Sequence, residues 1–327
     1  MRAWRVNELG HPSQSLRLEE VPDPVPGPGQ VMVRVEASNI NFADILLCQG
    51  IYQDRPGVPF TPGLETCGLV DAVGPGVDIA LGTRVAGMAA LPHGGYAERA
   101  LIRAGTALEM PADVPAPDAT VLYSTYQTAH VGLHHRGALQ AGEWLLVHSG
   151  AGGVGSAAVQ LGVAAGARVI ATAGGPTKVD HCLTLGARHG IDYSTADLHA
   201  TIMEITDGHG VDVAFDPVGG AVGDTTRRCM AWEGRLLVIG FASGAIPSYP
   251  ANHVLVKNYA VIGLHWGAYA EHGGRAIIEA AHTELLRLYR AGAIKPDISD
   301  VIRLANVPEA LRSLEAREVS GRLVLVP

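Results

Sequence analysis

Cysteine is scarce and positive charge is not in excess, and both features narrow the class of protein. The 327 residues include four cysteines, and none of them belongs to a C-x-x-C pair. Widely spaced single cysteines argue against a zinc ribbon and do not suggest a disulfide framework in a chain of this length. The formal net charge is −8 at pH 7. Because no basic surplus is available to displace counterions from phosphates, we expect no nucleic-acid partner.

Long apolar runs are also missing. The N-terminal MRAWRVNELG lacks the apolar stretch of a signal peptide. The most apolar long window, residues 157–173, contains Gln160, Arg168 and several glycines, which argues against a membrane span. We therefore expect no membrane partner and a cytoplasmic location. Hydrophobic residues still make up 47% of the chain, and its length suggests two domains.

The first hundred or so residues have the pattern of a β-rich domain. QVMVRVEAS at residues 30–38 alternates apolar and polar side chains, which is the period of a half-buried strand. Two more short strands, separated by glycine-rich turns, are expected at residues 65–77 and 82–90. Many short strands at short intervals predict a barrel or a sandwich.

After residues 111–117 the pattern changes to apolar strands that alternate with helices. Strands are expected in residues 143–149, 167–173, 211–219 and 234–243, and helices at 154–165 and 177–185. Apolar strands flanked by helices predict a parallel sheet that is covered on both faces. A sixth strand is expected in residues 258–266, a long helix at about 274–291, and a final strand in SGRLVLVP that returns to the first domain.

The sequence GAGGVG at residues 150–155 satisfies G-x-G-x-x-G between an expected strand and an expected helix. In that context Gly150 is expected to make the tight turn, and Gly152 to let the backbone approach a pyrophosphate. Gly155 is expected to let helix and strand pack closely. Gly153 and Val154 begin the helix, whose free N–H groups attract phosphate. The alternative interpretation is a purely structural turn.

The next strand indicates which dinucleotide binds. An NAD site usually carries an acid at the end of this strand, about 20 residues beyond the turn, where it binds the ribose 2′-hydroxyl. Here the strand ends in VIATAGGPTK, in which Thr172 and its successors are uncharged and Lys178 is the first charged residue. The missing acid and the nearby ammonium group favour NADPH over NADH. The alternative is that Lys178 is only a solvated helix residue.

A series of motifs links the whole chain to one family. They are NFAD at residues 41–44, GIY at 50–52, PFTPGLETCG at 59–68, AGGVG at 151–155, DPVGG at 216–220, GRLLVIGFASG at 234–244 and the closing GRLVL. In these motifs the chain resembles the zinc-free medium-chain dehydrogenases/reductases, specifically the NADPH:quinone oxidoreductases related to zeta-crystallin.

This resemblance implies an α/β architecture of two domains with the cofactor in the cleft between them. Residues 1–117 and 265–327 would form a GroES-like β-barrel catalytic domain. Residues 118–264 would form a Rossmann domain with a doubly wound parallel sheet. The family is commonly dimeric through its Rossmann sheets, so the resemblance also implies a homodimer.

The resemblance further implies that no metal is bound. In zinc-dependent relatives a cysteine three residues before an aspartate and the histidine of a G-H-E motif hold the metal. The corresponding residues here are Asn41, before Asp44, and Leu64. Because neither binds Zn²⁺ as thiolate and imidazole do, alcohol oxidation with a Lewis acid is disfavoured. Hydride transfer to a quinone or to the β-carbon of an enone remains.

The family match also assigns roles to single residues. Asn41 and Tyr52 would line the substrate pocket, where the Asn41 amide can donate to a carbonyl oxygen and Tyr52 can stack on a flat ring. Thr128 would lie near the nicotinamide ribose and Tyr193 beside the 2′-phosphate. Phe241 and Ser243 would lie beside the nicotinamide amide. Without the match, each of these is an ordinary turn, packing or loop residue.

Three functions stay open on the sequence alone. The first is an NADPH-dependent quinone reductase, and the second is an alkene reductase that acts on enones, enals or enoyl thioesters. The third is a protein that binds NADPH without catalysis. His130 and His134 are four residues apart, but no H-E-x-x-H motif includes them, so we expect packing or surface roles. Ser149 beside His148 is not expected to be a nucleophile pair, because adjacent strand residues point to opposite faces.

Overall fold

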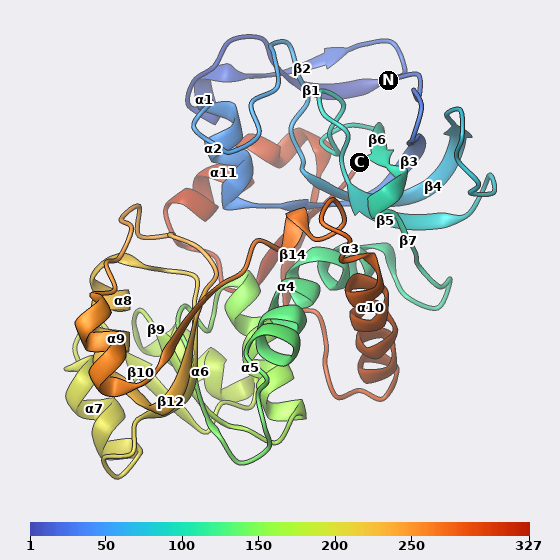
Figure 1. Cartoon of the computed structure of the whole chain (residues 1–327). Coiled ribbons are helices and arrows are strands. Elements are labelled where there is room, and N and C mark those ends of the chain that lie inside the picture. The colour runs from blue at the N-terminus through green and yellow to red at the C-terminus, as the bar shows by residue number, and fades with distance from the viewer. The chain divides into compact units, whose positions relative to one another are not determined.

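The computed structural model describes all residues, 1–327 (Figure 1). Its helices and strands form two compact units. Unit 1 comprises Met1–Ser124 and Ile298–Pro327, and unit 2 comprises Thr125–Asp297. The expected boundaries differ from this division, because residues 265–297 belong to unit 2 and residues 118–124 to unit 1.

The reason for the difference is the packing of the long helix and of the segment behind it. Helix α10 (Arg275–Arg290) packs against helix α4 (Gln127–His130) of the same unit. Beyond α10, the Lys295 backbone oxygen accepts hydrogen bonds from Tyr126 Oη (2.7 Å) and Gln160 Nε2 (3.0 Å). The Lys295 N–H donates to Gln160 Oε1 at 2.7 Å. These bonds hold residues 275–295 on unit 2.

Unit 1 is built on a seven-stranded sheet of the order β14-β15-β3-β4-β5-β7, with β6 also paired to β3. Its strands are β3 (Gln30–Ile40), β4 (Glu65–Val73), β5 (Arg84–Met88), β6 (Arg99–Arg103), β7 (Leu108–Glu109), β14 (Ile298–Arg303) and β15 (Arg322–Val326). The alternating valines of β3 are buried in the core of this sheet, as their period predicts. Strand β15 pairs antiparallel with β3, which confirms that the tail returns to the first domain.

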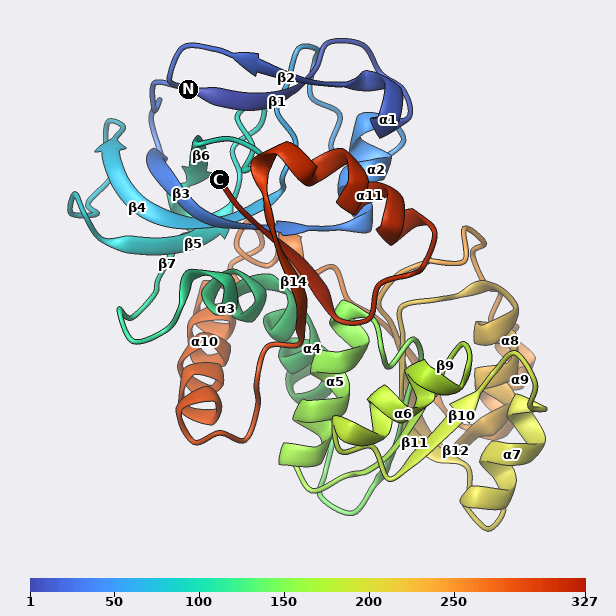
Figure 2. The ribbon, with the colours of Figure 1, turned by 180° about the vertical axis from the view of Figure 1, so that it is seen from behind.

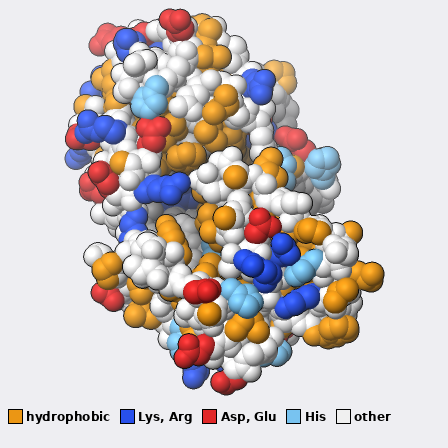
Figure 3. Space-filling view, turned by 90° about the vertical axis from the view of Figure 1, so that its left-hand side faces the viewer, with side chains coloured by type: hydrophobic (Ala, Val, Ile, Leu, Met, Phe, Trp, Pro, Cys, Tyr) orange, Lys and Arg blue, Asp and Glu red, His pale blue; other side chains and the backbone are white.

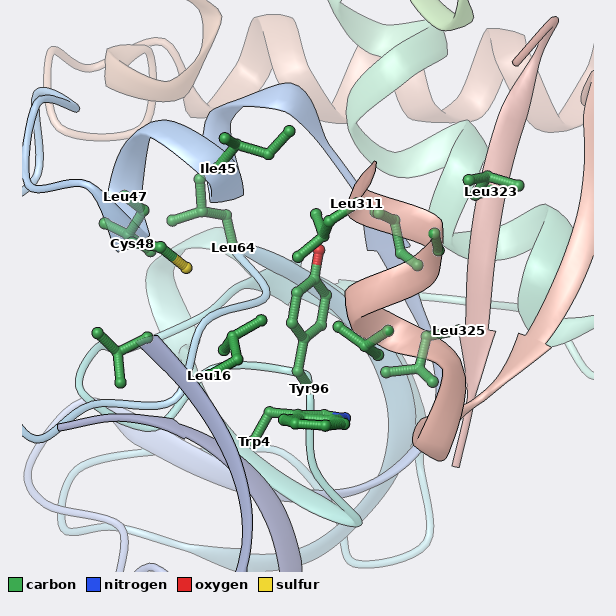
Figure 4. Close-up of a cluster of buried hydrophobic side chains, with 14 of the residues drawn as sticks. Trp4, Leu16, Ile45, Leu47, Cys48, Leu64, Tyr96, Leu311, Leu323 and Leu325 are labelled. Carbon is green, nitrogen blue, oxygen red and sulfur yellow. The ribbon is translucent and has the colours of Figure 1, made fainter. Parts of the chain in front are cut away.

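Helix α3 (Ala116–Val121) packs against β3 and β4, and the short turn η1 (Ala104–Thr106) follows β6. On the other side of the sheet lie the hairpin β1 (Arg2–Val6) and β2 (Leu16–Glu20), the helices α1 (Pro12–Ser15), α2 (Phe42–Cys48) and α11 (Val307–Glu315), and the turn η5 (Leu304–Asn306). Figure 4 shows the buried side chains between them, in which Tyr96 is surrounded by Trp4, Leu16, Leu64 and Leu311. This cluster supports the segment that carries Asn41.

Unit 2 contains the predicted parallel sheet. Its strands follow the order β10-β9-β8-β11-β12-β13, and all of their pairings are parallel. They are β8 (Trp144–Val147), β9 (Arg168–Ala173), β10 (His189–Asp192), β11 (Val211–Asp216), β12 (Met230–Val238) and β13 (Ala260–Gly263). This is the strand order of a dinucleotide-binding fold, in which successive strands are added on one side of β8 and then, from β11 onward, on the other side. The expected doubly wound architecture is thereby confirmed.

Helices connect these strands, and Figure 2 shows α5 and α6 in front of the sheet. They are α5 (Gly153–Ala164), α6 (Pro176–Thr184), α7 (Leu198–Ile205), α8 (Gly220–Cys229) and α9 (Ala251–Lys257). The π-helical turns η2 (Leu122–Tyr126) and η3 (Val131–Arg136) flank α4, and the turn η4 (Trp266–Ala268) follows β13. No helix in the chain is both long enough and apolar enough to traverse a bilayer.

Candidate functional site

The glycine-rich turn joins β8 to α5, as the sequence predicts, but the left-handed residue in the turn is not a glycine. Ser149 adopts a left-handed backbone with φ of 54°, whereas Gly150 was expected to make the tight turn. Gly150 is required for another reason. A Cβ atom there would lie 2.8 Å from Ala171 Cβ and 3.0 Å from Cys182 Sγ. The Gly150 N–H also donates to the Thr172 carbonyl at 2.9 Å, which ties the turn to β9.

The start of α5 has the form of a phosphate site. A Cβ atom at Gly155 would overlap the carbonyl oxygen of Ser149, so the helix approaches the end of β8 as closely as a glycine permits. A Cβ atom at Gly152 would lie 2.9 Å from Ser149 Oγ. The first intrahelical bond runs from Ser156 to Gly152 at 2.7 Å. The N–H groups of Gly153, Val154 and Gly155 therefore have no acceptor within the helix and can bind an anion.

The buried side chain of His148, which precedes this turn, links β9 to α8 through two hydrogen bonds. The sequence did not reveal this role. His148 Nδ1 lies 3.0 Å from Thr172 Oγ1, and its Nε2 lies 2.7 Å from Thr226 Oγ1 on α8. Thr226 Oγ1 donates its proton to the Val222 carbonyl, so His148 donates through Nε2 and accepts from Thr172. Burial lowers the pKa of His148, which keeps the ring neutral. Thr172 is thus enclosed, and it positions the turn rather than facing solvent.

An acid that the sequence did not reveal lies beside the end of β9. Asp192 ends β10 and pairs in register with Ala173. Its Oδ1 accepts from the Gly175 N–H at 3.0 Å and from Ser194 Oγ at 2.6 Å. These bonds lower the pKa of Asp192. The acid comes from the neighbouring strand rather than from β9 itself, so only the strand register could have indicated it.

Tyr193 and Lys178 lie at the same end of the sheet. A Cβ atom at Gly174 would be 2.8 Å from Tyr193 Oη, so the phenol lies directly over that glycine. Tyr193 is 46% exposed. Lys178 occupies the first turn of α6 and is half-buried. The structure therefore brings Tyr193, Lys178 and the Gly174–Gly175 turn to one end of the sheet.

The loops after β11 and β12 are packed against each other. The Ala242 and Ser243 N–H groups donate to the Pro217 and Val218 carbonyls, each at 3.0 Å. Asp216 Oδ1 accepts from the N–H groups of Val218 and Gly219 and holds the first loop. Phe241 remains 43% exposed beside Gly219. Thr128 is half-buried on α4, away from these loops in the sequence, and makes no side-chain hydrogen bond that links it to them.

In unit 1 a buried carboxyl group organises the segment around Asn41. Asp44 Oδ2 accepts from the Asn41 N–H at 3.0 Å and from Tyr96 Oη at 2.8 Å. Asp44 Oδ1 accepts from the N–H groups of Gly63 and Leu64 at 3.0 and 3.2 Å. Burial raises the pKa of Asp44 to about 6, although the bonds from Tyr96 and Asn41 oppose the shift. Asp44 therefore joins the start of α2 to the loop before β4.

The Asn41 side chain lies between two charged groups. Its Nδ2 donates to Glu65 Oε2 at 3.3 Å, and its Oδ1 accepts from Arg322 Nη1. Glu65 Oε2 also accepts from Asn39 Nδ2 at 2.8 Å and from Ser124 Oγ. The quoted motifs contain Glu65 and Arg322, but neither residue was singled out from the sequence.

Tyr52 lies near the same acids. It is half-buried and packs against the hydrophobic cluster that contains Ile45 and Leu64. Burial, and then the charges of Glu65 and Asp44, raise the pKa of Tyr52 to about 12. The phenol therefore stays protonated and can donate a hydrogen bond at any ordinary pH.

The two positions that hold zinc in metal-dependent relatives do not fit a metal here. The Asn41 amide already engages Glu65 and Arg322, and the Leu64 side chain is 4% exposed within the apolar cluster (Figure 4). No group of three histidine, cysteine, aspartate or glutamate side chains is arranged to hold a metal ion. The donor set at this site therefore does not suit Zn²⁺.

Comparison with known proteins agrees with both units. Residues 27–112 match the alcohol dehydrogenase GroES-like domain family, and residues 153–282 match the zinc-binding dehydrogenase family. A quinone oxidoreductase-like protein 2 homolog from Nematostella vectensis is 37% identical over 330 residues, which cover 99% of this chain and 88% of the relative.

Two solved structures of relatives are complexes with NADPH. The Escherichia coli quinone oxidoreductase complexed with NADPH has a TM-score of 0.91 and 30% identity, and the match covers 100% of each chain. A mycobacterial protein complexed with NADPH has a TM-score of 0.92 and 31% identity, again over 100% of each chain.

Proposed function

The chain belongs to the quinone oxidoreductase family of the medium-chain dehydrogenases/reductases, and from this premise we propose that it is an NADPH-dependent, zinc-independent quinone reductase. Unit 2 would hold the dinucleotide, and unit 1 would supply the side chains that bind the acceptor. The observation that carries the proposal is the Asn41 amide, which is held by Glu65 and Arg322 and keeps one N–H for an incoming oxygen.

NADPH fits the residues of unit 2. The glycines at positions 150, 152 and 155 leave no room for side chains, and the N–H groups of Gly153–Gly155 are open to a pyrophosphate. Tyr193 and Lys178 would bind the adenosine end with its 2′-phosphate. Thr128, Phe241 and Ser243 would bind the nicotinamide end. Thr172 would not contact the cofactor directly but would position the glycine-rich turn, whose Gly150 N–H donates to the Thr172 carbonyl. When bound, NADPH supplies a hydride, which carries both electrons of the reduction.

The acceptor would be a conjugated carbonyl compound. As negative charge develops on its oxygen, the free N–H of Asn41 stabilises that charge more strongly than it stabilises the ground state. Tyr52, which stays protonated, can stack on the acceptor ring and donate a second hydrogen bond. A proton from Tyr52 or from water completes the reduction. Because this route needs no Lewis acid, the unsuitable donor set at Asn41 and Leu64 does not impede it.

A side-by-side assay tests this function against its competitors. NADPH oxidation would be followed at 340 nm with 1,4-naphthoquinone and with an open-chain enone, each with and without EDTA. We expect turnover of the quinone that EDTA does not reduce. Turnover of the enone but not of the quinone would replace the proposal with an alkene reductase. Tight NADPH binding with no turnover of either acceptor would show a binding protein instead.

Lys178 is the cation that we expect to contribute to the preference for NADPH, beside the missing acid at the end of β9. We expect Lys178→Ala to weaken NADPH binding by about tenfold, which corresponds to one charge-assisted contact, and to leave NADH binding nearly unchanged. Fluorescence titration with both dinucleotides measures this. Lys257→Ala is the control, because Lys257 lies on α9 and donates to the Arg228 carbonyl. Equal weakening of NADPH and NADH would remove Lys178 from the 2′-phosphate site.

We also propose that the protein is a homodimer that uses the free edge of the unit 2 sheet. Strand β13 pairs only with β12, and an unpaired edge is a ready template for a second copy. Trp232, Leu255 and Val256 near this edge are 69–78% exposed. Figure 3 shows hydrophobic, basic and histidine side chains mixed on the face that carries α8 and α9. Light scattering after size-exclusion chromatography should give twice the mass of 34.1 kDa, and a monomer would refute the proposal.

A further inference from the structure

Strand pairing places a half-buried arginine beside the candidate catalytic amide. Strand β15 pairs antiparallel with β3 in the register Leu323–Ile40, so the residue before Leu323 lies beside the residue after Ile40. Those residues are Arg322 and Asn41. The contact between Arg322 Nη1 and Asn41 Oδ1 is therefore built into the sheet and does not depend on a flexible loop.

The environment of Arg322 is unusual for a structural arginine. Its Nε is buried and has no hydrogen-bond partner, and its Nη1 donates to the Asn41 amide oxygen. Burial lowers the pKa of Arg322, while the charges of Glu65 and Asp44 oppose the shift. The side chain keeps its positive charge all the same, because the pKa of an arginine is very high. A partly buried cation that donates its side-chain hydrogen bond to a neutral amide indicates a role in the function of that amide.

The two neighbours of Asn41 specify one orientation of its amide. Arg322 can only donate, so Oδ1 must face it, whereas the carboxylate of Glu65 can only accept, so Nδ2 must face it. A flipped amide would place its NH₂ group against the guanidinium and its oxygen against the carboxylate. Nδ2 then uses one hydrogen on Glu65 and retains the other. A bond from a cation to the amide oxygen also polarises the group, which strengthens the remaining N–H as a donor.

We propose that Arg322 is a positioning residue that acts through Asn41, and that it orients and polarises the amide N–H which stabilises the charge on the acceptor oxygen. This inference rests on the proposed function and extends it to a residue that does not itself bind the acceptor. Glu65 holds the other side of the same amide. The series Arg322–Asn41–acceptor would thus transmit the charge of the guanidinium to the reacting oxygen.

A double-mutant cycle tests whether Arg322 acts through Asn41. Removal of an oxyanion donor lowers kcat by about 10²–10³-fold, so we expect a loss of this size for Asn41→Ala. Arg322→Met should lower kcat by at least about tenfold with little change in NADPH affinity, and Arg322→Lys should recover part of the loss. In the Asn41→Ala background, Arg322→Met should cause no further loss. Equal losses in both backgrounds would overturn the proposal.

A spectroscopic readout separates this proposal from the proposed function. In protein labelled with ¹⁵N-asparagine, the NH₂ pair of Asn41 is identified by its absence in Asn41→Ala. Arg322→Met should shift this pair, and Arg303→Met, at an exposed position on β14, should not. If the wild type reduces neither acceptor, the proposed function fails and the spectrum still decides how the amide is held. An unshifted pair in folded Arg322→Met, or in the uncharged variant Arg322→Gln if the first variant does not fold, would overturn the inference.

Discussion

Replacing Gly155 with alanine should all but abolish dinucleotide binding. The added Cβ would overlap the backbone of Ser149 and Gly150, which cannot rotate away as a side chain can. The start of α5 must therefore move away from the end of β8, and each lost hydrogen bond to the charged pyrophosphate costs about 1.5–3 kcal/mol, or roughly ten- to a hundredfold in affinity. We expect a hundredfold weaker affinity for NADPH, together with a loss of about 1–3 kcal/mol in the free energy of unfolding from overpacking.

The matched control for this variant is Gly105→Ala. Gly105 lies in η1 of unit 1, has an ordinary φ, and a Cβ atom there would meet nothing within 4 Å. Fluorescence titration and urea denaturation of both variants separate a local clash from the general effect of a methyl group. If Gly155→Ala bound NADPH as the wild type does, the close approach of helix and strand would have no part in cofactor binding.

Neutralising Asp44 should remove a pH dependence from the stability of the protein. Burial raises the pKa of Asp44 to about 6 from its ordinary value of 3.8, so between these values the folded state binds more protons than the unfolded state. Stability from this group is therefore fully present at low pH and falls as pH rises toward 6. Two pKa units correspond to about 3 kcal/mol. The Asp44→Asn variant should lack this change, whatever its own stability.

Urea denaturation between pH 4 and 8 measures the free energy of unfolding of the wild type and of Asp44→Asn. In the difference between the two, the contributions of other titrating groups cancel. Tyr96→Phe provides a second variant, because the bond from Tyr96 lowers the pKa of Asp44. Its loss should move the transition to higher pH. A difference between wild type and Asp44→Asn that stays constant across this range would show that Asp44 does not titrate there.

Sequence patterns predicted most of the fold because the fold depends on periodicity. The alternation in residues 30–38 and the apolar runs at 143–149 and 167–173 gave the strands of both units. The domain boundary was harder to place. Helix α10 has an amphipathic pattern that could pack on either unit, and its packing against α4 and the bonds at Lys295 show which one it joins.

The candidate site was predictable only where a motif carries the chemistry. The turn at 150–155 was recognised from its glycines, although the left-handed residue is Ser149. Asp192 and Arg322 were missed because each reaches its partner through strand pairing, from 17 and 281 residues away in the sequence. A search along one strand cannot detect a side chain that the neighbouring strand contributes.

The split of unit 1 has a consequence for the order in which the protein assembles. Unit 2 is one continuous segment, whereas β15 pairs with a strand that the ribosome made almost 300 residues earlier. Domains fold as units during synthesis, so the dinucleotide-binding sheet can form while unit 1 still lacks its last strand. The amide of Asn41 gains its partner on Arg322 only when that strand arrives. A nascent chain would thus be able to bind its cofactor before it could reduce anything.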